Sequence, residues 1–276
     1  MKKLIIITGP TASGKTAMAV RLAQQLGTEI VSCDSRQFYK ELNIGVARPS
    51  EEELSLAKHH FIACRSVTEP YNISQYERDA LAVIRRLFYS HDYVIAVGGS
   101  GLYIDALRQG VTSMPDPTPE LRQRLQQMPL DEKRAQLRLL DPDYYTRVDL
   151  CNPVRLQRAL EVCFMTGRPY SCVLAESRPV QREFDIEMRV IRPDAASLRE
   201  RIDSRVDAMM AAGLLEEVRS VMPFRELSTL RTVGYRELFP VLDGIVAEAD
   251  AVAQIKLNTW HYAKKQLTWM RKYQYL

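Results

Sequence analysis

The sequence predicts an α/β protein in which a parallel β-sheet core is interrupted by a helical insertion. The first short apolar run leads directly into a glycine-rich loop and then a helix, as at the edge of a parallel sheet. Further apolar runs alternate with amphipathic stretches, which is the order of β-α-β units with right-handed crossovers. The alternation stops near residue 115, where a long stretch without a convincing strand begins.

The N-terminal part of the sheet is predicted from short apolar runs separated by helical stretches. Residues 4–8 are continuously apolar and end at a Gly-Pro pair, which is typical of a strand buried on both faces. Residues 16–26 place small and apolar residues along one side of a helix. A second strand is expected over residues 29–33, an amphipathic helix over 74–89, and a third strand over 93–97. Together these elements imply a parallel α/β sheet.

A proline-rich segment, MPDPTP at residues 114–119, marks the change of pattern. From there to about residue 176 only helices are expected, over residues 120–128, 131–140 and 153–166, separated by proline and glycine. This stretch is therefore interpreted as a helical insertion.

A strand is expected again over residues 184–191, after the helical stretch. The rest of the chain is largely helical, over residues 195–222, 231–242 and 248–273. The sequence thus predicts a core domain formed by residues 1–114 and 184–276, and a helical insertion over residues 115–183.

The composition is that of a soluble globular protein, with 46% apolar residues, 26% charged residues and a net charge of +4. No apolar run approaches the roughly 20 residues that cross a bilayer, so no membrane association is expected. The five cysteines are scattered and form no CxxC pair, which indicates free thiols in a reducing compartment and argues against a zinc site. We expect a cytoplasmic monomer.

A phosphate-binding loop is the strongest local signal. Residues 9–16, GPTASGKT, match the pattern GxxxxGK[ST] between a predicted strand and a predicted helix, as in P-loop NTPase-like proteins. The glycines allow backbone N–H groups and a helix N-terminus to face one anion. Lys15 adds a positive charge, and the Thr16 hydroxyl can bind Mg²⁺. The candidate phosphate-binding residues are Gly9, Pro10, Thr11, Ala12, Ser13, Gly14, Lys15 and Thr16.

The pattern indicates a di- or triphosphate and leaves open which one. Most P-loops hold a nucleotide whose P–O bond is broken. The third predicted strand ends in Gly98-Gly99, where an acidic residue often stands in such proteins, and no NKxD motif occurs. A phosphate-binding loop can equally hold a diphosphate that becomes a leaving group.

Asp34 ends the second predicted strand and therefore opens onto the same sheet edge as the phosphate-binding loop. A carboxylate there can orient Mg²⁺-bound water, cap the next turn or act as a general base, and the sequence does not choose between these roles. Ser35, Arg36 and Gln37 lie beside it with two aromatic residues. This combination suits a purine held by stacking and edge hydrogen bonds, and fits an ordinary polar loop equally well.

The C-terminal twenty residues contain no acidic residue and mix basic with aromatic side chains. Such a mixture suits phosphates and unstacked bases, while a solvated amphipathic helix is the simpler alternative. The residues concerned are Trp260, Tyr262, Lys264, Lys265, Trp269, Arg271, Lys272 and Tyr273.

Eight sequence blocks occur in the order found in bacterial tRNA dimethylallyltransferases, which the chain resembles from residue 4 to residue 271. The first block is the phosphate-binding loop, which many families share, and the later seven are specific. They are DSRQFYK at 34–40, IGVARP at 44–49, HHF at 59–61, GGSGLY at 98–103, RLQRALEV at 155–162, RTVGYR at 231–236 and KKQLTWMR at 264–271.

The resemblance implies a P-loop core with a helical insertion that contacts tRNA. It also implies transfer of a dimethylallyl group from dimethylallyl diphosphate to N6 of adenosine 37, in the tRNA anticodon loop. The implied catalytic residues are Asp34 as the base, Lys15, Ser100 and Arg231, with Mg²⁺ near Thr16. The implied tRNA-binding residues are Asp34, Ser35, Arg36, Gln37, Ser100, Arg122, Val154, Arg155, Leu156, Gln157, Arg158, Arg231, Arg236, Lys264, Lys265, Gln266, Trp269 and Arg271.

Other functions use the same local motifs. A P-loop small-molecule kinase would use Asp34 as the base toward a hydroxyl and would consume ATP. An isopentenyltransferase that acts on free AMP would share the donor chemistry, but the insertion and the basic, aromatic C-terminus favour tRNA. A non-catalytic RNA-binding or nucleotide-switch protein would not need Lys15, Thr16 and Asp34 together.

Overall fold

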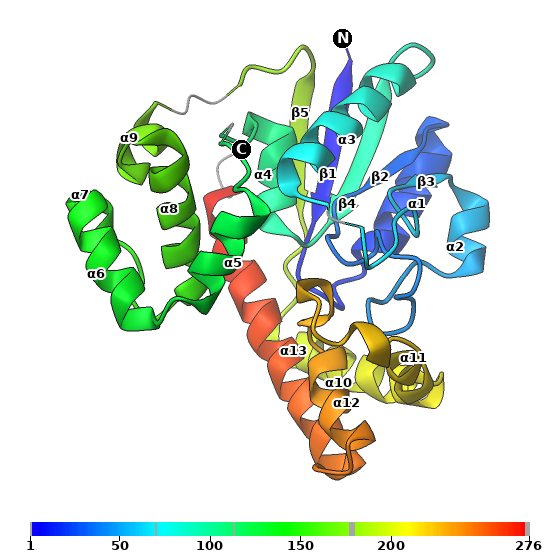
Figure 1. Cartoon of the computed structure of the whole chain (residues 1–276). Helices are drawn as coiled ribbons and strands as arrows, with labels where there is room; N and C mark the ends of the chain where they lie inside the picture. The colour runs from blue at the N-terminus through cyan, green and yellow to red at the C-terminus, as the bar shows by residue number, and fades with distance from the viewer. Residues whose placement is uncertain (1, 70, 113, 177–179, 274–276) are drawn as a thin grey trace. The chain divides into compact units, whose positions relative to one another are not determined.

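A five-stranded parallel β-sheet forms the centre of the structure, a computed structural model that describes every residue except 1, 70, 113, 177–179 and 274–276. The strands are β1 (Lys3–Thr8), β2 (Ile30–Ser32), β3 (His59–His60), β4 (Tyr93–Gly98) and β5 (Asp185–Val190). They lie in the order β3-β2-β4-β1-β5, and all neighbouring pairs are parallel (Figure 1). The predicted α/β fold with a parallel sheet is confirmed.

Strand β3 is the one strand that the sequence did not predict. It consists of two histidines, which pair with Ile30 and Val31 at the edge of the sheet. Two residues are too few to produce an alternating or continuous apolar pattern, so hydrophobic periodicity carries no signal for this strand.

The apolar sequence of β1 is explained by helices on both faces of the sheet. Leu4 and Ile6 belong to a buried cluster that includes residues of α3 (Ile73–Leu87), whereas Ile5 and Ile7 pack with residues of α1 (Lys15–Leu26). All four side chains are at most 2% exposed. Because successive strand residues face opposite sides, burial on both faces requires a continuous apolar run.

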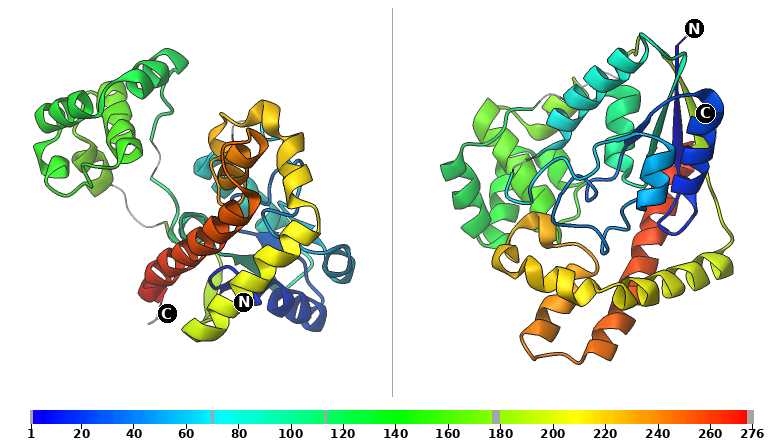
Figure 2. Two further views of the ribbon diagram at one scale, coloured as in Figure 1. Left: turned by 90° about the horizontal axis from the view of Figure 1, so that it is seen from below. Right: turned by 90° about the vertical axis from the view of Figure 1, so that its right-hand side faces the viewer.

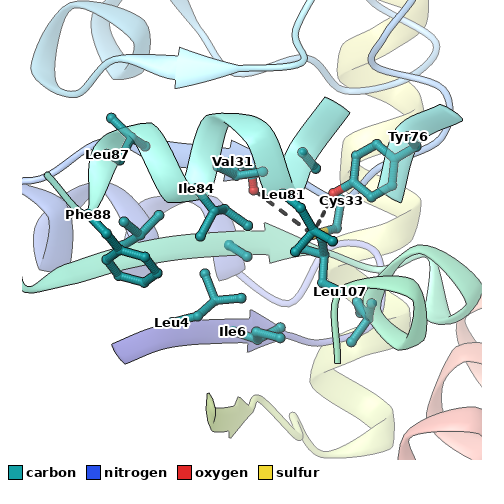
Figure 3. Close-up of a cluster of buried hydrophobic side chains, with 14 of the residues drawn as sticks. Leu4, Ile6, Val31, Cys33, Tyr76, Leu81, Ile84, Leu87, Phe88 and Leu107 are labelled. Atoms are coloured by element: carbon teal, nitrogen blue, oxygen red, sulfur yellow. Dashed lines mark hydrogen bonds between the residues drawn. The ribbon is translucent and has the colours of Figure 1, made fainter. Parts of the chain in front are cut away.

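A polar contact inside the first cluster fixes the end of β2 (Figure 3). Tyr76, on α3, is fully buried. Its hydroxyl lies 3.0 Å from the carbonyl oxygen of Ser32 and 3.2 Å from Sγ of Cys33. A buried hydroxyl needs such partners, and here they hold the chain just before Asp34.

The strand order brings three loops together at one edge of the sheet. β4 lies between β1 and β2, so the loops that follow these three strands are neighbours at the carboxyl edge, where ligands bind in open α/β sheets. The loop after β4 leads into α4 (Gly101–Gln109). Between β2 and β3 lies α2 (Glu51–Leu56), which buries none of its side chains and so has no apolar stripe that could predict it.

Four C-terminal helices lie beyond this carboxyl edge (Figures 1 and 2). They are α10 (Ala195–Ala211), α11 (Leu214–Ser220), α12 (Tyr235–Leu242) and α13 (Glu248–Met270), and α13 packs against both α10 and α12. The helix expected over residues 195–222 is broken at Gly213, whose φ of 96° suits glycine and interrupts a right-handed helix. Short 3-10 turns follow α11 and α13.

The chain divides into two compact units, Met1–Gln109 with Arg182–Leu276, and Gly110–Gln181. The proline-rich segment and the return of a predicted strand at residue 184 led us to expect the second unit over residues 115–183. The second unit contains α5 (Pro119–Gln127), α6 (Leu130–Leu140), α7 (Pro142–Tyr145), α8 (Pro153–Thr166) and α9 (Tyr170–Ala175), and its described residues form no strand.

The second unit has its own hydrophobic core, formed by leucine and alanine side chains of α5, α6 and α8. Capping explains why α8 has the predicted bounds. Asn152 accepts a hydrogen bond from the backbone N–H of Arg155, Pro153 occupies the first helical position, and Gly167 ends the helix with a positive φ. Across the described parts of both units, no helix is long and apolar enough to span a bilayer.

Candidate active site

A cavity of about 730 Å³ opens at the carboxyl edge of the sheet. The loop after β1, the end of β2, the loop at residues 45–49 and helices α10 and α13 all contribute to its walls, and so does the segment at residues 231–236. All of these segments belong to the first compact unit. Residues that are distant in the sequence therefore share one site.

The loop after β1 has the geometry of an anion cradle. Gly14, with φ of 82°, is the N-cap of α1, and no side chain caps that helix. The N–H groups of the first helical turn have no partner within the helix and are open to a ligand. The Ser13 hydroxyl is buried and has no hydrogen-bond partner among the described residues, although Ser13 lines the cavity. A β-carbon at Gly9 would lie 2.5 Å from Ser13 Oγ, so this position needs glycine.

Two cations converge on this loop. Lys15 Nζ donates to the carbonyl oxygen of Pro10 at 3.3 Å, and an Arg205 Nη1–H donates to Thr11 Oγ1 at 3.2 Å. Burial lowers the pKa of Lys15 to about 8, with Asp34 acting in the opposite sense and Arg205 in the same sense. Burial also lowers the pKa of Arg205. Both groups have lost water without gaining a full counter-charge, as expected of a site that receives an anion.

Arg205 is the functional candidate that the sequence did not reveal. It lies on α10, 194 residues from Thr11. The helix contains several other charged residues at similar spacing, and a single arginine among them carries no local signal. Only the packing of α10 beside the phosphate-binding loop distinguishes it.

Asp34 lies directly after β2 and lines the same cavity as Lys15. Its Oδ1 accepts the backbone N–H of Arg36 at 3.0 Å, and its own N–H donates to Ser32 Oγ at 3.3 Å. Oδ2 has no hydrogen bond to any residue that the structure describes. The carboxylate therefore caps its own turn with one oxygen and leaves the other available to a ligand.

Tyr262 of α13, which the sequence placed only in the basic and aromatic C-terminal stretch, is a neighbour of Asp34 in the cavity. Loss of water and then the negative charge of Asp34 raise the pKa of its phenol to about 12. The phenol therefore stays protonated at neutral pH and adds a hydroxyl group to the cavity wall.

Ser100 is brought to the turn that contains Asp34, although it is not part of the cavity wall. Its Oγ accepts the backbone N–H of Ser35 at 3.3 Å and lies 3.4 Å from the Ser35 hydroxyl. The structure thus joins the loop after β4 to the loop after β2. This contact orients the chain beside Asp34.

The side chains of Arg36 and Gln37 are occupied by the protein itself. An Arg36 Nη1–H donates to the carbonyl oxygen of Thr229 at 2.9 Å. Gln37 donates through Nε2 to the carbonyl oxygens of Ala47 at 2.9 Å and Val46 at 3.3 Å, and accepts from Ser32 through Oε1. Both were expected to contact tRNA, and both line the cavity as members of a bonded scaffold.

The candidate residues in the segment 231–236 and on the C-terminal half of α13 differ in exposure. Arg231 and Arg236 are exposed and line the cavity, and Arg236 pairs with the buried Glu237. Lys264 and Lys265 are exposed and border a second, open cavity of about 670 Å³ together with Trp269. Arg271 is also exposed, whereas Gln266 is only 6% exposed.

The helical unit presents some of its predicted residues and buries one. Arg122, Val154 and Arg155 are exposed. Leu156 is fully buried in the hydrophobic core, so its side chain does not form part of the surface. Gln157 and Arg158 are both bonded to the carboxylate of Glu161, at 3.0 Å and 3.3 Å.

A divalent cation has few protein ligands in this cavity. The described residues contain no group of three or more His, Cys, Asp or Glu side chains that could hold a metal ion. Thr16 and Asp34 are among the oxygen donors that line the cavity. This donor set fits Mg²⁺, which binds through one or two protein oxygens together with the phosphates of a substrate.

Comparisons with known proteins all indicate the same family. Residues 37–273 match the family model described as IPP transferase. A tRNA dimethylallyltransferase of Christiangramia forsetii is 44% identical over 273 residues, which cover 98% of this chain and 90% of the relative. One of Flavobacterium johnsoniae is 44% identical over 282 residues, with 99% and 91% coverage.

Solved structures give the same result. The full-length tRNA isopentenylpyrophosphate transferase of Bacillus halodurans superposes with a TM-score of 0.72 at 29% identity, over 98% of this chain and 87% of that chain. A eukaryotic dimethylallyltransferase acting on tRNA superposes with a TM-score of 0.84 at 25% identity, over 98% and 70%.

Proposed function

Because the chain belongs to the IPP transferase family, we propose that it transfers the dimethylallyl group of dimethylallyl diphosphate to N6 of adenosine 37 in tRNA and releases diphosphate. The observation that carries the proposal is one cavity that combines an anion cradle with a carboxylate. Lys15, Arg205 and the first turn of α1 form the cradle, and Asp34 provides a free carboxylate oxygen in the same cavity.

The reaction joins N6 of the adenine to C1 of the dimethylallyl group and breaks the bond between that carbon and the diphosphate oxygen. The bonding electrons leave with the diphosphate. The adenine amine is a poor nucleophile because its lone pair is delocalised into the ring. Asp34 accepts the N6 proton as the C–N bond forms, which offsets this weakness.

Charge accumulates on the diphosphate as the C–O bond breaks. The groups that surround this charge are the backbone N–H groups of the cradle, Lys15, Arg205 and the Ser13 hydroxyl, which has no partner among the described residues. Such preorganised donors lower the barrier, because they need not reorient during the reaction. Arg231, exposed at the edge of the cavity, adds a third cation.

Mg²⁺ fits the same end of the cavity, where the Thr16 hydroxyl would hold it together with diphosphate oxygens. When bound, the ion supplies additional positive charge to the leaving group. The protein residues bind and orient the diphosphate, and the ion would offset part of its negative charge.

The acceptor must leave its stack to reach an enclosed donor, so the adenine is extruded into the cavity. Exposed basic and aromatic side chains of α13, among them Lys264, Lys265 and Trp269, suit the phosphates and bases of the surrounding loop. In the helical unit, Arg122 and Arg155 are exposed cations that suit the same polyanion. These groups favour tRNA over free AMP as the acceptor.

The proposal is tested by incubating the protein with labelled dimethylallyl diphosphate and unmodified tRNA. We expect label in tRNA and release of diphosphate, with no requirement for ATP. Parallel reactions with AMP in place of tRNA, and with ATP and small hydroxyl compounds, test the two alternative activities. Absence of label from tRNA under conditions where the protein binds diphosphate would overturn the proposal.

A further inference from the structure

The side chain of Gln266 is buried between two loops of the cavity, and the resemblance to tRNA-modifying enzymes places it among the residues that bind tRNA. From its contacts we infer instead that Gln266 is a positioning residue, which fixes the phosphate-binding loop relative to the loop that contains Ser100. This inference rests on the proposed function for its consequences in catalysis. Its structural basis is independent of that function.

Both ends of the Gln266 carboxamide are bonded to main-chain groups. Oε1 accepts the backbone N–H of Thr11 at 2.9 Å, and Nε2 donates to the carbonyl oxygen of Gly99 at 2.9 Å. Gln266 is 6% exposed, whereas its neighbours Lys264 and Lys265 are exposed. Both polar atoms of this buried side chain are therefore already bonded to the protein main chain.

The loop after β4 reaches α13 closely enough to exclude a side chain. A β-carbon at Gly99 would approach Gln266 Nε2 far within van der Waals contact, and one at Gly101 would do the same with the indole of Trp269. Gln266 and Trp269 are three residues apart and so share one face of the helix. The glycines of the loop after β4 therefore let the main chain lie directly on this face of α13.

The C-terminal end of α13 is itself anchored to α4. Trp269 Nε1 donates to the Tyr273 hydroxyl at 3.3 Å, and that hydroxyl donates to Asp105 at 2.8 Å. Lys272 also pairs with the carboxylate of Asp105, which is only 7% exposed. These bonds fix the register of α13 against α4, and Gln266 then lies between the two loops.

The bridge leads to the proposed base through a short series of contacts. Ser100 follows Gly99, and its Oγ bonds to Ser35, which follows Asp34. At the other end, Thr11 precedes the residues of the anion cradle and receives the hydrogen bond of Arg205. One carboxamide thus joins the phosphate-binding loop to the loop of Gly99 and Ser100, and Ser100 in turn contacts the turn that contains Asp34.

The chemistry of the bridge requires one acceptor and one donor at the same position. Glutamine provides both. Ionised glutamate keeps the acceptor for the Thr11 N–H but places a negative oxygen against the Gly99 carbonyl oxygen. A protonated glutamic acid restores the donor, so Gln266→Glu should behave as a pH-dependent substitute, whereas Gln266→Met, with similar volume, lacks both groups at every pH.

The experiment compares these two variants with the unsubstituted protein under single-turnover conditions at saturating tRNA. Misplacement of reacting groups by about 1 Å can cost about 10²-fold in rate, so we expect both variants to transfer about 10- to 100-fold more slowly at pH 8. The rate of Gln266→Glu relative to the unsubstituted protein should rise several-fold between pH 8 and pH 6, because a buried carboxyl beside a carbonyl has a raised pKa. The corresponding ratio for Gln266→Met should stay constant.

Binding measurements separate positioning from RNA contact. The affinity of both variants for unmodified tRNA should stay within about two-fold of the unsubstituted value. Lys265→Gln, which removes an exposed cation next to Gln266 in the sequence, should weaken tRNA binding by more than about two-fold. A loss of tRNA affinity of tenfold or more in Gln266→Met, with an unchanged rate at saturating tRNA, would overturn the inference. So would equal pH profiles of the two variants, or unchanged rates in both.

Inorganic diphosphate distinguishes failure of this inference from failure of the proposed function. Its binding to the cradle needs no prenyl transfer, and we expect Gln266→Met to weaken it by a few-fold because Thr11 is released. If the unsubstituted protein binds diphosphate but transfers no label, the proposed function fails. The diphosphate-binding measurement still tests whether Gln266 positions the phosphate-binding loop. Equal diphosphate affinities of Gln266→Met and the unsubstituted protein would then overturn this inference.

Discussion

The two ends of the cavity are built in opposite ways. At the phosphate end, formed by residues 9–16 and Arg205, the donors are buried but unused: the Ser13 hydroxyl has no partner among the described residues, and the first turn of α1 has no side-chain cap. At the acceptor end, formed by residues 34–37 and 43–49, most polar side chains are already bonded to the protein. Gln37 uses both ends of its carboxamide, and Arg48 donates to the carbonyl oxygens of Tyr39, Lys40 and Leu42.

This difference suggests a division of labour. The phosphate end binds an anion directly. Its donors and cations are already positioned and desolvated before the anion binds. The acceptor end shapes the cavity with bonded side chains and leaves one oxygen of Asp34 free. Discrimination between acceptors at this end would then depend on the shape of a rigid wall more than on individual side-chain contacts.

Replacement of the free carboxylate should have the largest effect. Asp34→Asn keeps the Oδ1 acceptor for the Arg36 N–H but cannot take a proton, so we expect prenyl transfer to fall by about 10²–10⁴-fold. Affinity for inorganic diphosphate should change little, because the phosphate end is intact. Single-turnover transfer and calorimetric diphosphate binding measure the two quantities. Rapid transfer by this variant would remove Asp34 from its proposed role.

Arg205 tests whether the two cations at the phosphate end act on the leaving group. Arg205→Met retains the apolar stem and removes the charge, and loss of one such donor costs about 10²–10³-fold in rate. Diphosphate affinity should fall as well, unlike in Asp34→Asn. Arg201, which is exposed on the same helix, provides a matched control as Arg201→Met. A normal rate in Arg205→Met would show that Lys15 and the backbone suffice.

The lowered pKa of Lys15 predicts a pH dependence of diphosphate binding at the phosphate end. The charged form binds diphosphate, and in the free protein it is lost as the pH rises through about 8. Affinity for inorganic diphosphate should therefore weaken above pH 8, by up to about tenfold per pH unit for one titrating group. Lys15→Met should bind more weakly at every pH and show only the shallower dependence of diphosphate itself. Parallel pH profiles would contradict the assignment.

How much of this site the sequence predicted depends on how local each feature is. The phosphate-binding loop was predicted because its eight residues are consecutive and their conformation depends on two glycines. Asp34 was located because it ends a strand, although its role stayed open. Arg205 and Gln266 lie 194 and 255 residues from Thr11, and packing alone brings them to it.

The same distinction between local and non-local features applies to the elements of the fold. Helix α8 has the predicted bounds because Asn152, Pro153 and Gly167 define its ends locally. Strand β3 and helix α2 were missed, since one has two residues and the other buries no side chain. Their positions depend on the neighbouring sheet and loops, which no local pattern describes.

The rigidity of the acceptor end has its own support in Glu217, which is the subject of the prediction with the smallest effect on catalysis. Its carboxylate accepts the backbone N–H groups of Asn43, Ile44 and Gly45 at 2.7–3.0 Å, and Oε1 lies 2.5 Å from the Tyr235 hydroxyl. The same loop continues to the carbonyl oxygens that hold Gln37. A β-carbon at Gly45 would lie 2.6 Å from the Tyr235 ring, so the loop fits tightly here.

Glu217→Ala should therefore lower the free energy of unfolding by about 1–3 kcal/mol, since it leaves the Tyr235 hydroxyl and partly buried backbone N–H groups without this partner. Transfer should slow by only a few-fold, through a larger KM for tRNA, while diphosphate affinity stays unchanged. Glu216→Ala, at an exposed neighbouring position, is the control and should change stability by less than about 0.5 kcal/mol. Urea unfolding and steady-state kinetics measure both effects. If Glu217→Ala weakened diphosphate binding instead, the two ends would be coupled, and the loop at 43–49 would have to be treated as part of the phosphate site.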